Sequence, residues 1–423
     1  ETTAAMQIVV AGAGIGGLTS ALSLAAAGFA NVQVLEAAAQ IRQVGVGVNL
    51  PPHAVRELTE LGLGDALKAA GIATSELAYY DRQGRLIWAE ARGLAAGYRW
   101  PQYSIHRGRL QDLLHEAVQS RLGAHAVRCG QRVGSAAARG DKLAVRTNQG
   151  AAAKAEFEAD LLVAADGIRS ALRAQHYPGQ ALATNGWMMY RGTTRGAPFL
   201  SGSSMVIIGD EHLRVVVYPI EQGVNNWLLV RPAKVGGDEL GNWNREVDPQ
   251  ALAACVAEWR FDWLDVPALV AGSDIAWEYP MADFDPLPRW VFGRTALLGD
   301  AAHAMYPFGS NGASQAILDA RVLAFHLAAH AGPDMQAADI DAALAAYQAE
   351  RLPVASAVQL ANRRQAGDVM ARVGALVRQN AHAGAQAELQ EVEARYKRLA
   401  GFDAETLNTR PSWSVHADAS PLP

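Results

Sequence analysis

The sequence has little cysteine and no excess of positive charge, and each shortage excludes a class of protein. Its 423 residues include two cysteines, Cys129 and Cys255, which are far apart and form no CxxC pair. This spacing predicts neither a disulfide framework nor a zinc site, and it favours a reducing, cytoplasmic compartment. With 37 Lys and Arg against 42 Asp and Glu, the formal net charge is −5. No basic field is therefore expected to attract nucleic acid or an anionic membrane.

A metal-binding motif is also missing. His326 and His330 are four residues apart, a spacing that places two imidazoles on one face of a helix. The glutamate of the HExxH motif is absent, and no third ligand is evident. We therefore predict no metal site.

The segment from Ile8 to Ala30 carries no charge, and on length alone it could span a bilayer. It contains several glycines, no basic residue precedes it and no signal-type cleavage pattern follows it. We predict that this segment is buried in a protein core and that the protein has no membrane partner.

The same segment opens a βαβ unit. A buried strand at residues 7–11 is followed by Gly-Ala-Gly-Ile-Gly-Gly at 12–17, a helix at 15–28 and a second strand at 32–35. This order of elements is typical of dinucleotide-binding folds, although a glycine-rich structural turn is the alternative.

Each glycine of the fingerprint has its own purpose. Gly12 allows the tight turn, Gly14 lets the backbone approach a pyrophosphate, and Gly17 lets the helix pack closely on the strand. Glu36 follows the second strand, where an acidic residue accepts hydrogen bonds from ribose hydroxyls. The pattern predicts a nucleotide cofactor without separating FAD from NAD.

A second candidate site lies far along the chain. An apolar run at residues 295–298 ends at Gly299-Asp300, and a carboxylate there can accept hydrogen bonds from the polyol hydroxyls of a cofactor. After a loop, a helix opens at residues 309–313. Its free N–H groups and dipole would stabilise negative charge on a reduced flavin, although an ordinary capped helix would show the same pattern. Together with the N-terminal fingerprint, this site predicts an FAD enzyme.

The middle of the chain changes character. Short β-rich runs with turn signals occur around residues 77–88 and 187–230, and they predict a mostly antiparallel domain inserted into the first. The expected fold is α/β, with a doubly wound, Rossmann-like FAD-binding domain, an inserted β-rich substrate domain and C-terminal helices. The expected boundaries are 1–75, 101–182 and 281–352 for the FAD-binding domain, 76–100 and 183–280 for the substrate domain, and 353–423 for the C-terminal helices and tail.

Three motifs, in this order and spacing, resemble those of the class A flavoprotein aromatic hydroxylases. They are Gly-Ala-Gly-Ile-Gly-Gly-Leu at 12–18, Ala-Asp-Gly-Ile-Arg-Ser at 165–170 and Leu-Leu-Gly-Asp-Ala-Ala-His at 297–303, within a resemblance that spans most of residues 6–365. The resemblance implies bound FAD, NAD(P)H (NADH in preference) as a transient co-substrate, and no separate nicotinamide domain. It also implies that O₂ is captured as a flavin C4a-hydroperoxide, which hydroxylates an aromatic ring.

The resemblance also implies which residues bind FAD. The ADP half would lie against the fingerprint and Glu36, and Asp166 and Asp300 would lie at strand ends beside the cofactor. No acid–base residue is assigned to catalysis, because the flavin supplies the chemistry. The full implied set is Gly12, Gly14, Ile15, Gly16, Gly17, Glu36, Arg42, Gly47, Val48, Arg107, Asp166, Asp300, Gly312 and Ala313.

For substrate contact, our candidates are Tyr190, Arg191, Tyr218 and Pro307. An arginine can pair with a carboxylate through two hydrogen bonds, and aromatic rings suit a planar ligand. The alternative is that the tyrosines pack within a sheet, Arg191 is a surface charge and Pro307 belongs to a turn.

Further segments at 100–108 and 311–319 extend the resemblance towards hydroxylation of a phenazine carboxylate, with loss of CO₂ if the attacked carbon carries the carboxylate. Tyr190 stands where this resemblance would place Trp, and His53 replaces an Asn common in the wider family. The alternatives are a smaller aromatic acid of the salicylate or hydroxypyridine type, or a flavin oxidase or dehydrogenase without oxygenation. We expect a monomer or a homodimer.

Overall fold

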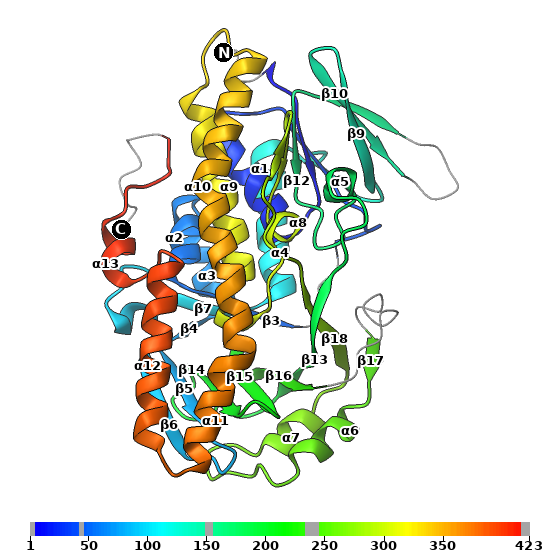
Figure 1. Ribbon diagram of the computed structural model, residues 1–423. Coiled ribbons are helices and arrows are strands. Elements are labelled where there is room, and N and C mark those ends of the chain that lie inside the picture. The colour runs from blue at the N-terminus through cyan, green and yellow to red at the C-terminus, as the bar shows by residue number, and fades with distance from the viewer. Residues whose placement is uncertain (1–4, 42–45, 149–154, 233–244, 416–423) are drawn as a thin grey trace.

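A six-stranded sheet forms the upper part of the molecule in Figure 1. The computed structural model describes residues 5–41, 46–148, 155–232 and 245–415. All neighbours in this sheet are parallel except the edge strand β19, and the central strands β1 and β12 are buried along their whole length. In spatial order the strands are β19 (Val291–Phe292), β20 (Thr295–Leu297), β12 (Leu161–Ala164), β1 (Ile8–Ala11), β2 (Val32–Leu35) and β8 (Val127–Arg128).

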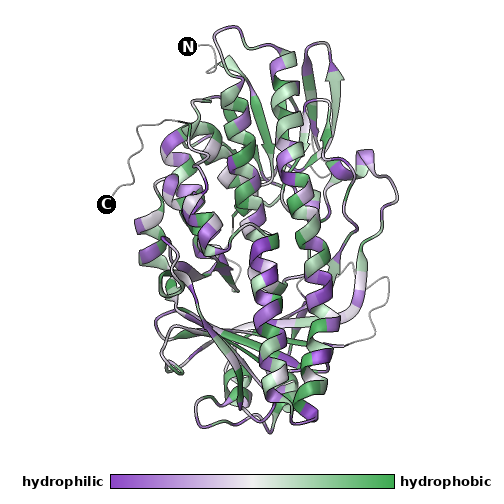
Figure 2. Ribbon diagram, turned by 60° about the vertical axis from the view of Figure 1, so that its left-hand side comes forward, coloured by the Kyte–Doolittle hydropathy of each residue, from purple (hydrophilic) through white to green (hydrophobic). Residues whose placement is uncertain are grey.

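Helices and a small antiparallel sheet cover this parallel sheet. Helix α1 (Ile15–Ala26) packs against α4 (Arg107–Leu122) and α9 (Gly312–Ala329). A meander of β9 (Val133–Arg139), β10 (Lys142–Thr147) and β11 (Glu156–Ala159) contacts β1 and β12. Figure 2 shows these upper strands as hydrophobic, whereas the long helices carry both colours. Because both faces of the sheet are covered, its central strands β1 and β12 are apolar throughout instead of alternating.

A second, eight-stranded sheet forms the lower part of the molecule. Its neighbours are antiparallel except for β14 and β5. The spatial order is β17 (Arg245–Val247), β18 (Ala276–Asp283), β13 (Ala183–Arg195), β16 (Val224–Pro232), β15 (Arg214–Glu221), β14 (Ser204–Gly209), β5 (Glu76–Tyr80) and β6 (Leu86–Ala91). A three-stranded sheet of β3 (Gly47–Leu50), β7 (Gln102–His106) and β4 (Ile72–Thr74) completes the strands.

The two faces of the eight-stranded sheet have different neighbours. Buried side chains of one face form a hydrophobic cluster with α6 (Pro249–Ala253) and α7 (Val266–Ala271). On the other face, residues of β5 and β6 pack against α11 (Met370–Arg378) and α12 (His382–Leu399). The predicted fold class, with a doubly wound parallel sheet, a β-rich second unit and C-terminal helices, is confirmed.

Helix α10 (Ala337–Arg364) connects the two large sheets and runs between them in Figure 1. Near its middle, Tyr347 Oη donates to the carbonyl of Leu297 in β20 at 2.8 Å. Near its end, Arg363 Nε lies 2.7 Å from Asp283 Oδ2 in β18. One helix therefore contacts both sheets, which holds them in a defined relation. The remaining helices are α2 (Pro52–Glu60), α3 (Gly64–Ala70), α5 (Ala171–His176), α8 (Asp300–His303) and α13 (Ala404–Thr409).

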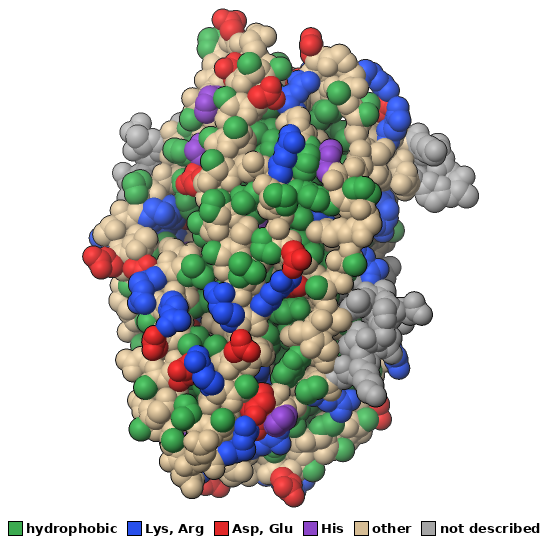
Figure 3. Space-filling view, in the orientation of Figure 1, with side chains coloured by type: hydrophobic (Ala, Val, Ile, Leu, Met, Phe, Trp, Pro, Cys, Tyr) green, Lys and Arg blue, Asp and Glu red, His purple; other side chains and the backbone are tan. Residues whose placement is uncertain are grey.

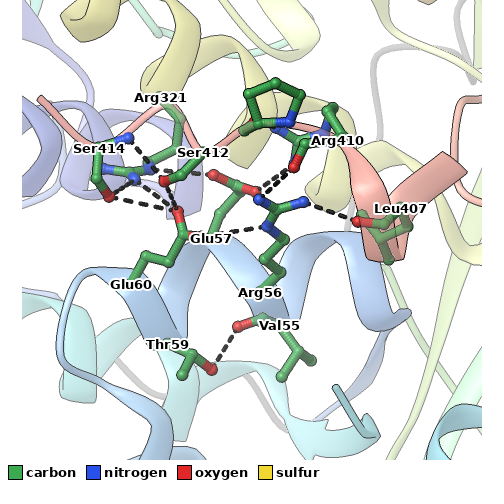
Figure 4. Close-up of polar contacts among 11 residues, drawn as sticks. Val55, Arg56, Glu57, Thr59, Glu60, Arg321, Leu407, Arg410, Ser412 and Ser414 are labelled. Atoms are coloured by element: carbon green, nitrogen blue, oxygen red, sulfur yellow. Dashed lines mark hydrogen bonds and ion pairs between the residues drawn. The ribbon is translucent and has the colours of Figure 1, made fainter. Parts of the chain in front are cut away.

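The segment that follows α13 is held on α2 by an ionic network (Figure 4). Glu57 of α2 is fully buried, and its two oxygens lie 3.2 Å from Arg321 Nε and 2.8 Å from Arg410 Nη2. Arg56 donates to the carbonyls of Leu407 and Arg410, both at 2.8 Å. A carboxylate this deeply buried requires its cationic partners, so the C-terminal segment is a structural part of the fold.

Figure 3 shows the charge on one face of the molecule, where basic and acidic side chains are intermingled over the lower half. None of the helices in the described residues combines the length and apolarity that a membrane span requires. Within the same residues, no group of three or more His, Cys, Asp or Glu side chains is placed to hold a metal ion. Cys129 and Cys255 are both free.

Candidate active site

The glycine-rich turn between β1 and α1 lies against the end of β12. Gly12 has φ +101°, and a Cβ there would lie 2.2 Å from the carbonyl oxygen of Ala165. A Cβ on Gly17 would lie 1.8 Å from the carbonyl oxygen of Gly12. Packing of the protein therefore requires both glycines. Gly14 is exposed, and no atom lies within 4 Å of the position where its Cβ would be.

The helix after this turn can receive an anion. The N-terminus of α1 has no side-chain cap and no acidic residue in its first turn. Free N–H groups and the positive end of the helix dipole favour a phosphate at such a place. Glu36 Oε2 accepts a hydrogen bond from Ala13 N at 2.7 Å, and Gln111 donates to the carbonyl of Ala13 at 2.8 Å. Glu36 therefore also holds the shape of the turn.

Two carboxylates follow neighbouring parallel strands, so they share the edge of the sheet that carries the glycine turn. Asp166 follows β12, and its Oδ1 is buried without a hydrogen-bond partner. Burial raises the pKa of Asp166. Asp300 follows β20 as the exposed first residue of α8. Ligands of open α/β sheets bind at this edge, and an orphaned acceptor is the kind of group that a cofactor hydroxyl would satisfy.

Arg173 lies between these carboxylates. Its Nη1 donates to the carbonyl of Ala301 at 3.2 Å, and its Nη2 donates to the carbonyl of Ile168. The guanidinium carbon lies 4.3 Å from the centre of the Phe284 ring. Burial lowers the pKa of Arg173, and the negative charges of Asp166 and Asp300 oppose that shift. The arginine thus ties α8 to the segment that follows β12.

Strand β3 brings a close backbone approach between the two halves of the molecule. A Cβ on Gly47 would lie 2.8 Å from side-chain atoms of Tyr218 and Ile220 in β15. Gly47 N donates to Asn226 Oδ1 in β16 at 2.7 Å. The neighbouring Val48 is half-buried, and Arg42 lies outside the described residues. Gly47 therefore fixes the implied flavin strand against the eight-stranded sheet.

The segment before α9 contacts β3 and forms the α9 side of the candidate site. No atom lies within 4 Å of a Cβ built on Gly312, and the adjoining Ala313 is half-buried. Helix α9 has no side-chain cap and no acidic residue in its first turn. Its N-terminal N–H groups can therefore stabilise negative charge on a ligand in front of them.

A buried polar network supports the α9 side of the site. The sequence analysis did not predict it. His303 Nε2 lies 2.5 Å from Asp319 Oδ2, and Arg351 Nε lies 2.8 Å from Asp319 Oδ1. Burial alone would raise the pKa of Asp319, but the charges and hydrogen bonds of His303 and Arg351 outweigh it, so the pKa is lowered. Arg351 Nη2 also donates to Gln315 Oε1 at 2.5 Å, and Gln315 Nε2 donates to Asn311 Oδ1 at 2.9 Å.

This network extends to the C-terminal helices. Asn311 Oδ1 lies 2.8 Å from His53 Nε2, and Asn311 Nδ2 lies 3.2 Å from Tyr396 Oη. The His53 ring stacks on Phe402 with ring centres 4.3 Å apart, and burial lowers the pKa of His53 to about 3. His53 is therefore neutral at physiological pH.

Strand register shows which side chains of the eight-stranded sheet share the face near β3 and α9. Arg191 pairs with Leu228, which pairs with Val216, so these residues form one row on this face. Tyr218 lies two residues from Val216, and Tyr279 lies two residues from Trp277, the partner of Arg191 in β18. Side chains two residues apart on a strand face the same way, so both tyrosines lie on this face. The predicted candidates Arg191 and Tyr218 therefore share one surface.

Arg191 is available to an anion. Its guanidinium carbon lies 5.4 Å from the centre of the Tyr279 ring, its Nε has no hydrogen-bond partner, and burial lowers its pKa. In the described part of the chain, the groups that act on its charge are Tyr218, Tyr279 and Arg107, and none of them is a carboxylate. Burial raises the pKa of Tyr218 to about 12, against the opposing charges of Arg191 and the exposed Arg107.

The other substrate candidates are placed differently. Tyr190 lies on the opposite face of β13, packs in the cluster beside α6 and α7, and its Oη accepts a hydrogen bond from Arg231 Nη2 at 3.1 Å. Its ring thus packs on the face opposite Arg191, because adjacent residues of a strand face opposite ways. Pro307 precedes the turn at Phe308–Ser310, and the neighbouring Tyr306 packs against Met189 of β13.

Comparisons with known proteins give a consistent result. The sequence profile of a family described as FAD binding domain matches residues 5–361. The chain is 45% identical over 375 residues to phenazine 1,6-dicarboxylic acid hydroxylase PhzS from Lysobacter antibioticus, covering 86% of this chain and 90% of that protein. It is 31% identical to a salicylate hydroxylase from Pseudomonas putida, covering 84% of each.

Solved structures agree. HpxO from Klebsiella pneumoniae, complexed with FAD and uric acid, superposes with a TM-score of 0.76 at 25% identity, covering 93% of this chain and 96% of that one. A salicylate hydroxylase substrate complex superposes with a TM-score of 0.74 at 25% identity, covering 96% and 98%.

Proposed function

The chain belongs to the FAD binding domain family, among the class A flavoprotein aromatic hydroxylases, and we propose that it hydroxylates a phenazine carboxylate with NADH as reductant. As a member of this class it is a flavin-dependent monooxygenase that uses FAD, NAD(P)H and O₂. The proposal concerns the substrate, the choice of NADH and the residues that act.

One observation carries the choice of an aromatic acid. Arg191 presents a guanidinium without an anionic partner on the sheet face that meets β3 and the segment before α9. Tyr279 and Tyr218 lie beside it. A carboxylate would satisfy the guanidinium through charge-assisted hydrogen bonds, and the aromatic rings would pack against a planar ligand. The likeness to the Lysobacter hydroxylase favours a phenazine as that ligand.

Three places in the structure fit the binding of FAD. The turn at Gly12 and Gly17 leaves Gly14 open for a pyrophosphate, Asp166 offers a buried acceptor without a partner, and the N-terminus of α9 offers free N–H groups. Bound FAD supplies hydride acceptance from NADH and oxygen transfer to the ring. The residues that we propose to hold it are Gly12, Gly14, Ile15, Gly16, Gly17, Glu36, Gly47, Val48, Arg107, Asp166, Asp300, Gly312 and Ala313.

The residues of the chain bind and orient the substrate and exclude water from it. Arg191 orients the substrate through its carboxylate, and Tyr306 and Met189 pack together in a buried cluster beside the turn that carries Pro307. The free N–H groups and the dipole of α9 would stabilise negative charge on bound FAD. Removal of water strengthens each of these electrostatic contacts.

A smaller aromatic acid is the second candidate. The Pseudomonas salicylate hydroxylases are 31% and 32% identical to this chain, and Arg191 would anchor the carboxylate of a single-ring acid by the same contact. The domain boundaries given above, the cytoplasmic location and a monomeric or homodimeric state stay predictions.

The test compares Arg191→Met with a matched control. Arg231→Met removes a guanidinium from the neighbouring strand, on the opposite face. With phenazine-1-carboxylate, wild-type holoenzyme should show strongly stimulated NADH oxidation. Because a charge-assisted pair contributes about 1.5–3 kcal/mol, Arg191→Met should raise KM by about 10- to 150-fold, whereas the KM of Arg231→Met should match that of wild type.

Three outcomes separate the candidates. Stimulation by salicylate and not by the phenazine acid would move the substrate to single-ring acids. Equal effects of Arg191→Met on phenazine-1-carboxylate and on unsubstituted phenazine would remove Arg191 from the carboxylate site. Equal KM values for the Arg191 and Arg231 variants would contradict the assignment altogether.

A further inference from the structure

A second arginine on the same sheet face also lacks an anionic partner. Arg214 of β15 is 3% exposed, and its guanidinium carbon lies 4.7 Å from the centre of the Phe308 ring and 5.7 Å from that of Trp187. Its Nη2 reaches the carbonyl of Ala366 at 3.5 Å, the outer limit of a hydrogen bond, and its Nε has no partner. Burial lowers the pKa of Arg214 to about 10.

The acidic groups that act on Arg214 are engaged elsewhere. Asp210 Oδ2 lies 2.5 Å from Arg82 Nε, and Glu211 Oε1 lies 2.6 Å from Arg378 Nη2. Tyr79, the remaining group that acts on its charge, donates its hydroxyl to Glu393 at 3.0 Å. Among the described residues, no carboxylate therefore lies within ion-pairing distance of Arg214.

Strand register relates Arg214 to Arg191. Arg214 pairs with Val230, which pairs with Met189, one row along from the row of Arg191 and Leu228. The two arginines thus flank β16 on one face, with apolar Leu228 and Val230 between them. With strands ~4.8 Å apart and a rise of ~3.4 Å per residue, their Cα atoms are about 12 Å apart.

Burial of an unpaired cation is costly, and an apolar side chain of similar length would fill the same space without that cost. Packing alone therefore does not account for Arg214. The guanidinium lies over the rings of Phe308 and Trp187, and its N–H groups lie in its own plane, where a carboxylate binds. Phe308 belongs to the segment between Asp300 and α9, so this guanidinium lies beside the segment that we propose to contact FAD.

We propose that Arg214 binds a second acidic group of the substrate, so that the site recognises a planar aromatic diacid. Arg191 holds one carboxylate and Arg214 the other, and the ring system lies over the half-buried Leu228 of β16. This inference rests on the proposed function. It makes a second negative charge on the substrate a determinant of specificity. A single-ring monoacid held by Arg191 would leave Arg214 without a partner.

The test measures diacid preference, defined as the Kd of phenazine-1-carboxylate divided by the Kd of phenazine-1,6-dicarboxylate. Both are titrated against FAD-loaded protein by the change in flavin absorbance. Wild type should prefer the diacid by about tenfold or more, as a charge-assisted pair predicts. Arg214→Met should abolish the preference. Arg191→Met should weaken both ligands, and Arg231→Met, on the opposite face, should change neither Kd.

Arg214→Lys provides a second variant that keeps the charge and loses the bidentate fork, in case the Met variant does not fold. It should show a reduced preference between those of wild type and Arg214→Met. The inference would be overturned, while the proposed function stands, if the wild-type protein bound both acids with equal affinity. It would also be overturned if Arg214→Met or Arg214→Lys kept the diacid preference of the wild-type protein. Absence of binding of either phenazine acid by wild type would refute both.

Discussion

Alanine at two glycines of one turn should have different effects, on stability at Gly17 and on FAD binding alone at Gly14. A Cβ on Gly17 would lie 1.8 Å from the carbonyl oxygen of Gly12, against 3.4–4 Å for ordinary contact. Backbone lies on both sides of this contact, so α1 must move away from β1. Overpacking costs about 1–3 kcal/mol, and here we expect about 3 kcal/mol. The apo form of Gly17→Ala should therefore lose stability, and with it the FAD site.

Gly14→Ala should affect only the cofactor. No protein atom lies within 4 Å of its Cβ position, and its φ of −74° suits any residue. Alanine is a poorer N-cap than glycine by about 0.5–1 kcal/mol, and the smaller entropy of the unfolded chain offsets about as much. The new methyl group would enter the space that we assign to the pyrophosphate. We expect FAD affinity to fall by about 100-fold, which corresponds to about 2.7 kcal/mol.

The assay separates stability from binding. Urea denaturation of the apo proteins, followed by tryptophan fluorescence, gives the free energy of unfolding, and quenching of FAD fluorescence gives Kd. Gly332→Ala is the control, because its Cβ also meets open space and it lies outside the implied site. If apo Gly14→Ala is destabilised as much as Gly17→Ala, or if it binds FAD like wild type, the assignment of the pyrophosphate site is refuted.

Three further perturbations test the support of the site. Arg351→Met removes a partner of the fully buried Asp319 and should cost about 3–5 kcal/mol in urea denaturation; a loss below about 1 kcal/mol would contradict this role. Burial lowers the pKa of His53 to about 3, below its unfolded value of about 6.5, so the unfolded chain binds more protons between these values. Stability should fall by about 1.4 kcal/mol per unit as pH drops through this window, and His53→Asn should lack this component; identical slopes would refute it. Arg410→Met removes one partner of buried Glu57 and should speed proteolysis of the C-terminal segment; an unchanged cleavage rate would show that the ionic network does not hold it.

Local motifs were enough to predict the fold class and the cofactor. Short apolar strands that end at Gly12, Asp166 and Asp300 are neighbours in one parallel sheet, so motifs far apart in sequence meet at one edge. The prediction of an FAD-dependent aromatic monooxygenase is confirmed by the family match and by the relatives. The individual site residues stay predictions.

Side-chain direction in the eight-stranded sheet could not be predicted in the same way. Tyr190 and Arg191 are adjacent, so only one of them can face the flavin strand, and the pairing of β13 with β16 decides which. Such register depends on partners distant in sequence. For the same reason, the sequence alone does not place Arg214 near Arg191. The two residues are neighbours only because β13 and β15 both pair with β16.

The sequence contains a pattern that indicates the buried network beneath the site. Asn311, the N-cap of α9, and Gln315 and Asp319 within α9 follow one another at a spacing of four residues, which places three polar side chains on one face. Buried polar side chains need partners, so this stripe predicts a network. Its partner Arg351, on α10, could not be identified without the packing of the two helices.

The measurement that tests the central claim most directly is oxygen labelling. Purified FAD-loaded protein is supplied with NADH, phenazine-1-carboxylate and ¹⁸O₂, and the product is analysed by mass spectrometry. An aromatic monooxygenase must place one ¹⁸O atom in the product for each NADH consumed in coupled turnover. An unlabelled product formed together with one equivalent of peroxide would show an oxidase and contradict the account.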